Sequence, residues 1–289
     1  YSLPGMNFTV VVFYIGEKAL GQLEVKARNE KGSWQLENLS IKNPDGQLKG
    51  KGSWQNLGRH QTHLEFDLAA NDVGKLLTRL GYVDAVKRGQ AKLSGGLDWE
   101  GPLTTINYPS LSGTLNVHAE KGQFNKLEPG IGKLLGLISL QSLPRRLTLD
   151  FRDVFSDGLA FDSIEGLAFD SIEGKLAIRK GVMRTTEPLK INGPAAQIQM
   201  QGEADLKNET QNLRVVVRPE IGGAAAMGAA LVNPVVGVAT LVANTVLRDP
   251  LNRLFSYRYQ VTGTWDDPKI DKEGTAEVPK PASEEGSKP

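Results

Sequence analysis

The sequence predicts a mainly β protein built on a long antiparallel sheet. Apolar and polar residues alternate with a period of two through most of the chain, which is the pattern of half-buried strands. Clusters of Gly, Asn and Pro divide these runs at short intervals, as in antiparallel meanders. Helical periodicity is confined to a few short segments. Together these observations favour a sheet with little helical cover.

The alternating runs place aliphatic and aromatic side chains on one face of the expected sheet. Between His63 and Leu68, for example, apolar residues take the even positions and polar residues the odd ones. The residues expected on the apolar face are Leu64, Phe66 and Leu68, Leu115 and Val117, Leu147, Leu149 and Phe151, Leu176 and Ile178, Ile198 and Met200, and Leu213, Val215 and Val217. The same alternation is typical of a closed sandwich or barrel core, so the pattern alone leaves open and closed sheets as alternatives.

The eight-residue unit GLAFDSIE occurs at 158–165 and again, without a gap, at 166–173. Because side chains alternate faces along a strand, an insertion of eight returns every later residue to its former face. On an α-helix the same insertion turns the downstream apolar stripe by roughly 80°. The repeat therefore favours β-structure, and we interpret it as a duplication in a tolerant hairpin. A loose Gly-x-Trp signature at 32–34, 52–54 and 263–265 indicates similar β-units.

A short amphipathic helix is expected after residue 70. Asn71 can cap it and Gly81 can take the C′ position. Its apolar residues follow the i, i+3, i+4, i+7 rule and are Val73, Leu76, Leu77 and Leu80.

A second helix is expected over 129–143, ending at Pro144 and followed directly by Arg145 and Arg146. Two interpretations of these arginines stay open. They complement the helix C-terminus while both helices cover one sheet face, or they bind a phosphate headgroup.

Residues 221–247 form a stretch of 27 residues without a charge. One continuous helix of this length would measure about 40 Å, enough to cross a bilayer. Asn233 and Pro234, however, form an N-cap and N1 pair, which favours two helices that are each too short to cross. We weigh helices buried against the sheet, an amphipathic pair at a bilayer surface, and a true span. The expected membrane-contact residues are Met227, Leu231, Val235, Val238, Leu241 and Val242.

Composition excludes several function classes. Lys plus Arg (34) balance Asp plus Glu (33), so no global positive field attracts nucleic acid. Cysteine is absent, which removes thiol catalysis and Cys-based zinc sites. His60, His63 and His118 lack metal-site spacing, and no HExxH, GxSxG or Walker motif occurs. We therefore expect a binding protein without cofactor or metal, not an enzyme.

Several long stretches closely resemble the C-terminal region of the AsmA-like family, in its YhdP branch. They are GKLLGLISLQSLPRRLTLDFRDVFSDGLAFDSIEG (132–166), the following KLAIRKGVM, and NPVVGVATLVANTVLRDPLNRLFSYRYQVTGTWDDPKI (233–270). The resemblance covers about residues 60–271. It implies an inner-membrane-anchored protein that crosses the periplasm of diderm bacteria as a long twisted sheet with a hydrophobic groove and supports phospholipid movement toward the outer membrane. The family pattern carries a single GLAFDSIE, so the doubled copy is a departure.

We therefore expect a long twisted antiparallel sheet that curves into an open hydrophobic groove, because the predicted helices are too few to seal so many strands. The expected parts are 1–70, strands that continue a groove from upstream; 71–219, a β-groove with two helices; 220–255, a helical lid or membrane contact; 256–271, a final strand; and 272–289, a disordered tail. Because the chain opens with Tyr1 and no signal peptide, we read it as a fragment whose anchor lies upstream.

The expected function is phospholipid transfer between the inner and outer membranes, with the lipid tails on the apolar face. The alternative is a structural β-scaffold that holds no lipid and whose helices dock an envelope protein partner.

Overall fold

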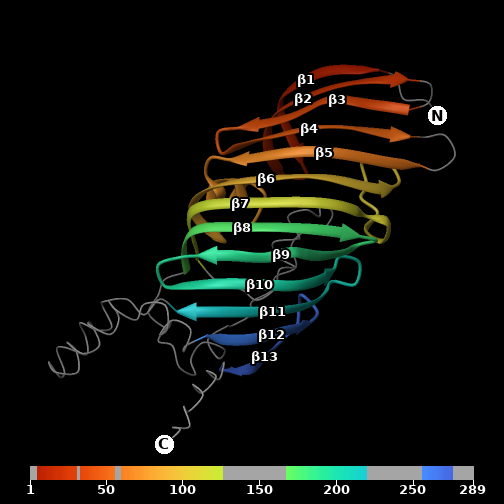
Figure 1. Ribbon diagram of the computed structural model, residues 1–289. Coiled ribbons are helices and arrows are strands. Elements are labelled where there is room, and N and C mark those ends of the chain that lie inside the picture. The colour runs from red at the N-terminus through yellow and green to blue at the C-terminus, as the bar shows by residue number, and fades with distance from the viewer. Residues whose placement is uncertain (1–4, 31–32, 56–59, 126–166, 220–255, 276–289) are drawn as a thin grey trace, which may run out of the picture.

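The computed structural model describes residues 5–30, 33–55, 60–125, 167–219 and 256–275. In this part of the chain thirteen strands form one antiparallel sheet in which spatial order equals chain order (Figure 1). The mainly β fold class is thus confirmed. The strands are β1 (Met6–Ile15), β2 (Lys18–Glu30), β3 (Ser33–Asn43), β4 (Gly46–Gln55), β5 (Gln61–Ala70), β6 (Val86–Glu100), β7 (Ser112–Phe124), β8 (Leu167–Arg179), β9 (Val182–Asn192), β10 (Ala196–Asp205), β11 (Thr210–Pro219), β12 (Tyr257–Gly263) and β13 (Pro268–Thr275).

The sequential order gives the sheet two different lateral edges. Because neighbouring strands are antiparallel, the odd-numbered strands end at one edge and the even-numbered strands end at the other. The helix α1 (Val73–Arg79) follows β5, so we name the edge at which the odd-numbered strands end the helix edge. The other edge, which holds the connection 101–111 between β6 and β7, is the loop edge.

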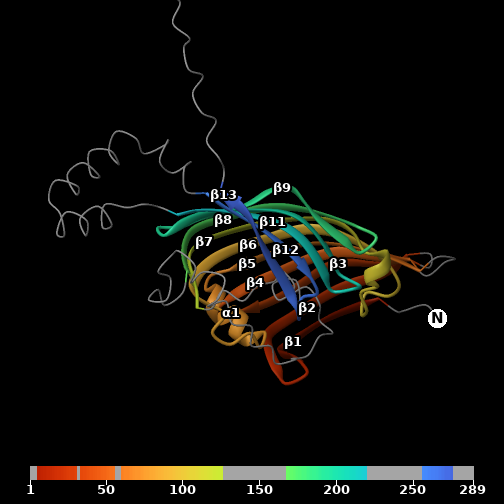
Figure 2. The same cartoon turned by 90° about the horizontal axis from the view of Figure 1, so that it is seen from below.

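The sheet is open and bowed, with α1 on its concave side (Figure 2). Bulges contribute to this shape because an extra residue in one strand bends it and increases its twist. Register shifts occur between Leu36 and Leu39 against β4 and between Met200 and Glu203 against β9. In the described residues the sheet does not close, which agrees with the expected curved groove rather than with a sandwich or barrel.

The helix α1 confirms the expected amphipathic segment, with one correction at its start. The N-cap is Asp72, not Asn71: its carboxylate accepts a hydrogen bond from the backbone N–H of Lys75. Asp72 has extended backbone and its side chain reaches the third helical N–H, which is the geometry that a cap requires. Gly81, with φ of +94°, occupies the left-handed position after the helix as expected.

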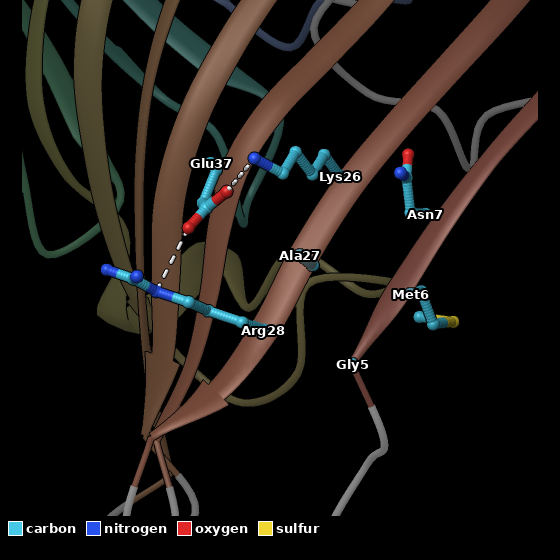
Figure 3. Close-up of a pocket in the computed structure, with 7 residues that line it drawn as sticks. All are labelled: Gly5, Met6, Asn7, Lys26, Ala27, Arg28 and Glu37. Atoms are coloured by element: carbon cyan, nitrogen blue, oxygen red, sulfur yellow. Dashed lines mark ion pairs between the residues drawn. The ribbon is translucent and has the colours of Figure 1, made fainter.

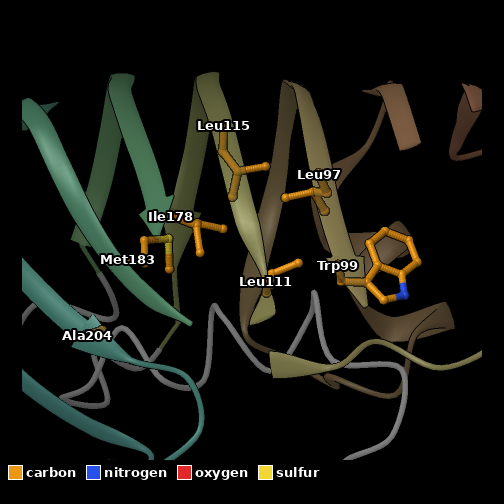
Figure 4. Close-up of a cluster of buried hydrophobic side chains, with 7 residues drawn as sticks. All are labelled: Leu97, Trp99, Leu111, Leu115, Ile178, Met183 and Ala204. Atoms are coloured by element: carbon orange, nitrogen blue, oxygen red, sulfur yellow. The ribbon is translucent and has the colours of Figure 1, made fainter. Parts of the chain in front are cut away.

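A second short element covers the loop edge of the concave face. The connection 101–111 contains the 3₁₀ helix η1 (Tyr108–Ser110) and ends at Leu111, which is fully buried. The indole Nε1 of Trp99 donates to the backbone oxygen of Pro102 at 3.0 Å and fixes the start of this connection. Figure 4 shows Leu111 in a cluster with Leu97, Trp99, Leu115, Ile178, Met183 and Ala204.

The C-terminal part differs from the expectation. Residues 256–271 were expected to form one final strand, but they contribute to a hairpin of two, β12 and β13. Residues 272–275, expected in the disordered tail, prolong β13 because they pair with β12, with Lys272 opposite Tyr259. The turn expected at Asp266 and Asp267 does connect the two strands, where the backbone N–H of Asp267 donates to Thr264 Oγ1.

Several expectations lie outside the described residues. They are the helix over 129–143, Arg145 and Arg146, the groove residues Leu147, Leu149 and Phe151, the first copy of GLAFDSIE, and the segment 221–255 with its membrane-contact residues Met227, Leu231, Val235, Val238, Leu241 and Val242. Residues 167–173 of the second copy lie in β8, as the strand interpretation predicts.

Candidate functional site

The concave face of the sheet is the candidate site. Residues directly opposite one another in an antiparallel pair share a face, as do alternate residues along a strand. Leu68 lies opposite Leu93, Leu93 opposite Val117, and Leu115 opposite Leu176. Ile178 lies opposite Met183 and Met200 opposite Val215. The twelve described residues that the sequence assigned to the apolar face therefore lie on one face.

These twelve residues differ in how far they are covered. Leu115 and Ile178 are 1% exposed, Leu213 3% and Val217 5%. They belong to the protein's own core. The half-buried members, whose side chains keep accessible surface, are Leu64, Phe66, Leu68, Val117, Leu176, Ile198, Met200 and Val215. Sequence alternation could not make this distinction, because it reports the face of a residue and not what lies above it.

Two covers lie over parts of the concave face, and the first of them buries Leu115 and Ile178. At the loop edge the connection 101–111 packs Leu103, Ile106 and Leu111 into the cluster of Leu115 and Ile178. At the helix edge α1 places Leu77 in a second cluster, whose other buried members are Val86, Ala119, Phe169 and Ile191. Each cover occupies one side of the concave face.

Between the two covers runs a line of apolar residues that we name the central row. It takes one residue from each of twelve successive strands and is formed by Val10, Leu23, Ile41, Leu48, Leu68, Leu93, Val117, Gly174, Leu189, Met200, Val215 and Tyr259. Gly174 and Leu189 adjoin, since a Cβ on Gly174 would lie 3.1 Å from Leu189 Cδ1. At about 4.8 Å per strand the row extends roughly 50 Å across the sheet.

The middle of the central row is incompletely covered. Leu48, Leu68, Leu93, Val117 and Met200 are half-buried, and none of them belongs to a buried cluster of the described residues. The row continues at β9 and β11 with Leu189 and Val215, which are also half-buried. A continuous apolar line with accessible surface is suited to hydrocarbon, since it contains no side chain that hydrogen-bonds or ionises before Tyr259.

Sequence reasoning found four members of the row, Leu68, Val117, Met200 and Val215, and missed the others. Leu48 and Leu93 stand in glycine-rich strands, QLKGKGSW and KLSGGLDW, where glycine takes the neighbouring inward positions. Reading Gly50 and Gly95 as inward positions would have revealed both leucines, because they lie two residues away from them.

The convex face carries charged side chains that pair with one another across neighbouring strands. Lys51 lies 2.9 Å from Glu65, and His63 Nδ1 lies 2.8 Å from Asp98 Oδ1. The hydrogen bond to Asp98 raises the pKa of His63, against a smaller opposing effect of burial. The hydrogen bond from Lys51 lowers the pKa of Glu65. In the described strands no group of three or more His, Asp or Glu is arranged to hold a metal ion. This face is typical of a solvated surface.

A shallow hollow of about 260 Å³ lies where β1, β2 and β3 meet (Figure 3). Gly5, Met6, Asn7, Lys26, Ala27, Arg28 and Glu37 line it. Glu37 accepts from Lys26 Nζ at 2.9 Å and from Arg28 Nε at 3.0 Å, and the hydrogen bond from Lys26 lowers its pKa. Because the charges satisfy one another, the hollow offers a weaker site than the concave face.

Comparison with known proteins identifies one family that the chain resembles. The family model described as "YhdP protein" matches residues 1–270. A curated relative, the intermembrane phospholipid transporter YhdP of Escherichia coli (strain K12), is 31% identical over 228 residues, which are 78% of this chain and 17% of the relative. The chain thus spans less than a fifth of that protein. No solved structure matches.

The described helices include none with the length and apolar character needed to span a membrane. The family model covers nearly the whole chain, and the relative agrees with it over more than three quarters. The chain therefore belongs to the YhdP family.

Proposed function

We propose that the concave face carries the acyl chains of phospholipids along the central row, and that the chain is one section of a conduit between the inner and outer membranes of the cell envelope. The observation that carries the proposal is the central row itself, an apolar line across twelve strands with accessible surface between two covers. The curated relative's description as an intermembrane phospholipid transporter supports the same class of cargo.

The physical advantage of such a row is the removal of a solvation barrier. Exposing a methylene group to water costs about 0.8 kcal/mol. A chain of about 16 carbons that left a membrane through water would face a barrier of roughly 12 kcal/mol. Contact with Leu68, Leu93 and Val117 replaces water around each methylene, so lipid passes from strand to strand without full exposure.

The other expected roles remain proposals based on the sequence. Arg145 and Arg146 would bind phosphate, and 221–255 would act as a lid or as the contact with the receiving membrane. Residues 1–70 would join the sheet of a longer, inner-membrane-anchored protein in the periplasm. Among the described strands β1 has one unpaired edge, which could accept such a neighbour.

The test is photo-crosslinking on the two faces of one strand. A photoreactive residue at Val117, on the central row, should capture phospholipid in cells, whereas the same residue at Asn116, on the convex face, should capture none. The captured lipid is identified by mass spectrometry of the purified adduct. Absence of lipid at position 117, and at Leu68 in a second variant, would reject conduction and favour the scaffold that docks an envelope protein.

A further inference from the structure

All four tryptophans of the chain lie at the loop edge of the concave face. Trp34 is the second residue of β3 and is directly opposite Trp54, near the end of β4. Trp54 is opposite Thr62, and Thr62 is opposite Trp99. Trp265, in the β12–β13 turn, packs against the same buried cluster as Trp99. We name Trp34, Trp54, Trp99 and Trp265 the tryptophan rim.

The rim contains buried polar groups without a partner. The indole nitrogens Nε1 of Trp54 and Trp265 are shielded from solvent and make no hydrogen bond within the chain. Gln211, which is 5% exposed, has neither its Nε2 nor its Oε1 paired. It lies opposite Ala204, a member of the cluster that Trp265 contacts. A buried donor without an acceptor costs about 1–3 kcal/mol, so this edge favours a ligand that supplies acceptor oxygens.

Trp99 differs from the other two indoles because its Nε1 already donates to Pro102. It therefore holds the connection 101–111 and has no donor left for a ligand. This difference separates Trp99 from Trp54 and Trp265, whose Nε1 donors make no hydrogen bond within the chain.

The helix edge has the opposite character. Its cluster around Leu77 consists of aliphatic and aromatic side chains, among them Val86 and Phe169. Among the described residues, the buried polar atom without a partner at this edge is Asn125 Oδ1, which is an acceptor. The buried side-chain donors without a partner among the described residues thus lie at the loop edge, whereas Arg79 and Asp45 at the helix edge pair with one another.

We infer that the tryptophan rim binds the glycerol-ester and phosphate oxygens of phospholipids that lie side by side across the sheet, while their acyl chains run along the strands, over the central row, toward α1. This inference rests on the proposed function and adds an orientation to it. Tryptophan suits this place because its ring is apolar and its N–H is polar, as in the aromatic belts at membrane interfaces. Every lipid would then travel with its headgroup at the loop edge.

The test uses the rim as its own reporter, since all tryptophan fluorescence of the chain arises there. The purified chain is loaded with phosphatidylcholine brominated either beside the ester carbonyls or near the chain ends. We expect clearly stronger quenching from the ester-proximal bromines. Equal quenching, or stronger quenching from the chain ends, overturns the orientation.

Native mass spectrometry of the same samples distinguishes failure of the lipid orientation from failure of lipid binding itself. Bound lipid without quenching by either probe overturns the inference but leaves the proposed function standing. No bound lipid with either probe rejects the proposed function itself. Quenching that requires intact vesicles, and disappears with detergent-dispersed lipid, identifies a bilayer surface as the occupant and also overturns the inference.

Two variants test the donors directly. Trp54→Phe and Trp265→Phe keep an aromatic ring but remove the N–H, and each should lower lipid occupancy about five-fold, the effect of one hydrogen bond. The matched control, Tyr82→Phe at the helix edge, keeps its ring, removes a hydroxyl outside the rim, and should leave occupancy unchanged. Unchanged occupancy in both test variants would show that these donors do not bind the lipid.

Discussion

The guanidinium of Arg79 donates to Asp45 Oδ2 through both Nε, at 2.9 Å, and Nη2, at 2.6 Å. Its Nη1 also donates to the backbone oxygen of Ala19 at 3.1 Å. These bonds join the last residue of α1 to the β3–β4 turn and to the start of β2. The cover at the helix edge is thus fixed to strands that precede it in the chain.

We therefore predict that Arg79→Met loosens α1. Losing a charge-assisted pair that is largely shielded from solvent should cost about 2 kcal/mol of local stability, and Asp45 would be left buried without its partner. Hydrogen exchange of the α1 amides measures this loss. The control is Lys75→Met on the same helix, where an exposed pair with Asp72 should contribute little. Equal exchange in both variants would contradict the anchoring role.

A charge on the central row should stop lipid binding without unfolding the sheet. Val215→Asp places a carboxylate where half-buried apolar surface meets the proposed lipid, so lipid occupancy should fall by more than ten-fold. Val216→Asp, one residue along and on the convex face opposite Arg258, should bind lipid normally. Leu213→Asp, at a buried position, should unfold the region. Circular dichroism and native mass spectrometry distinguish these outcomes; unfolding of Val215→Asp would favour a sealed core.

The pH dependence of the convex face should follow His63. The hydrogen bond to Asp98 raises the pKa of His63 above its ordinary value of 6.5, so the folded state binds this proton more tightly than the unfolded state. The resulting stabilisation is complete below about pH 6.5 and is lost as the pH rises through the raised pKa. An NMR titration of the His63 ring should show the raised pKa, and Asp98→Asn should lower it. An unchanged pKa in Asp98→Asn would remove Asp98 as the cause.

Removing residues 158–165, one copy of GLAFDSIE, should leave the sheet intact. The β8 strand uses the second copy, and its later part fixes the register, since Ile178 is 1% exposed. If the first copy took the place of the second in β8, the strand would shift by eight residues. Asp170 would then occupy the buried position of Ile178 and bury a carboxylate. The deletion variant should therefore keep the same Leu115–Leu176 pairing, which an engineered disulfide at a neighbouring pair can verify. A shifted crosslink would show that the first copy contributes to the sheet.

The edge strand β1 should cause self-association of the isolated chain. Val11 is 81% exposed, and Phe8 and Tyr14 are exposed as well, on a strand whose outer edge has no partner among the described strands. Long apolar edges pair with other chains, and a lysine at the edge prevents this. Val11→Lys should shift sedimentation toward the monomer, whereas Val83→Lys, an exposed position near α1, should not. Equal sedimentation of both variants would exclude β1 as the contact.

The strands were predictable because period-two alternation is a local property. Leu64, Phe66 and Leu68 show their common face without knowledge of any neighbour, and the helix of Leu76 and Leu77 shows its period in the same way. The N-cap was placed one residue early because both Asn71 and Asp72 are good caps, and only backbone geometry selects between them.

By itself, the sequence determined that this chain forms strands with one apolar face, since each strand carries that information in its own residues. Tertiary structure alone decided which residues of that face stay accessible. Leu115 and Val117 lie two positions apart on β7 and look alike in the sequence, yet the connection 101–111 helps to bury the first and leaves the second half-buried. The same holds for the tryptophan rim and for the His63–Asp98 pair, whose members are 35 residues apart. The reason is physical: burial and pairing depend on the register between strands, which joins residues that no local pattern relates.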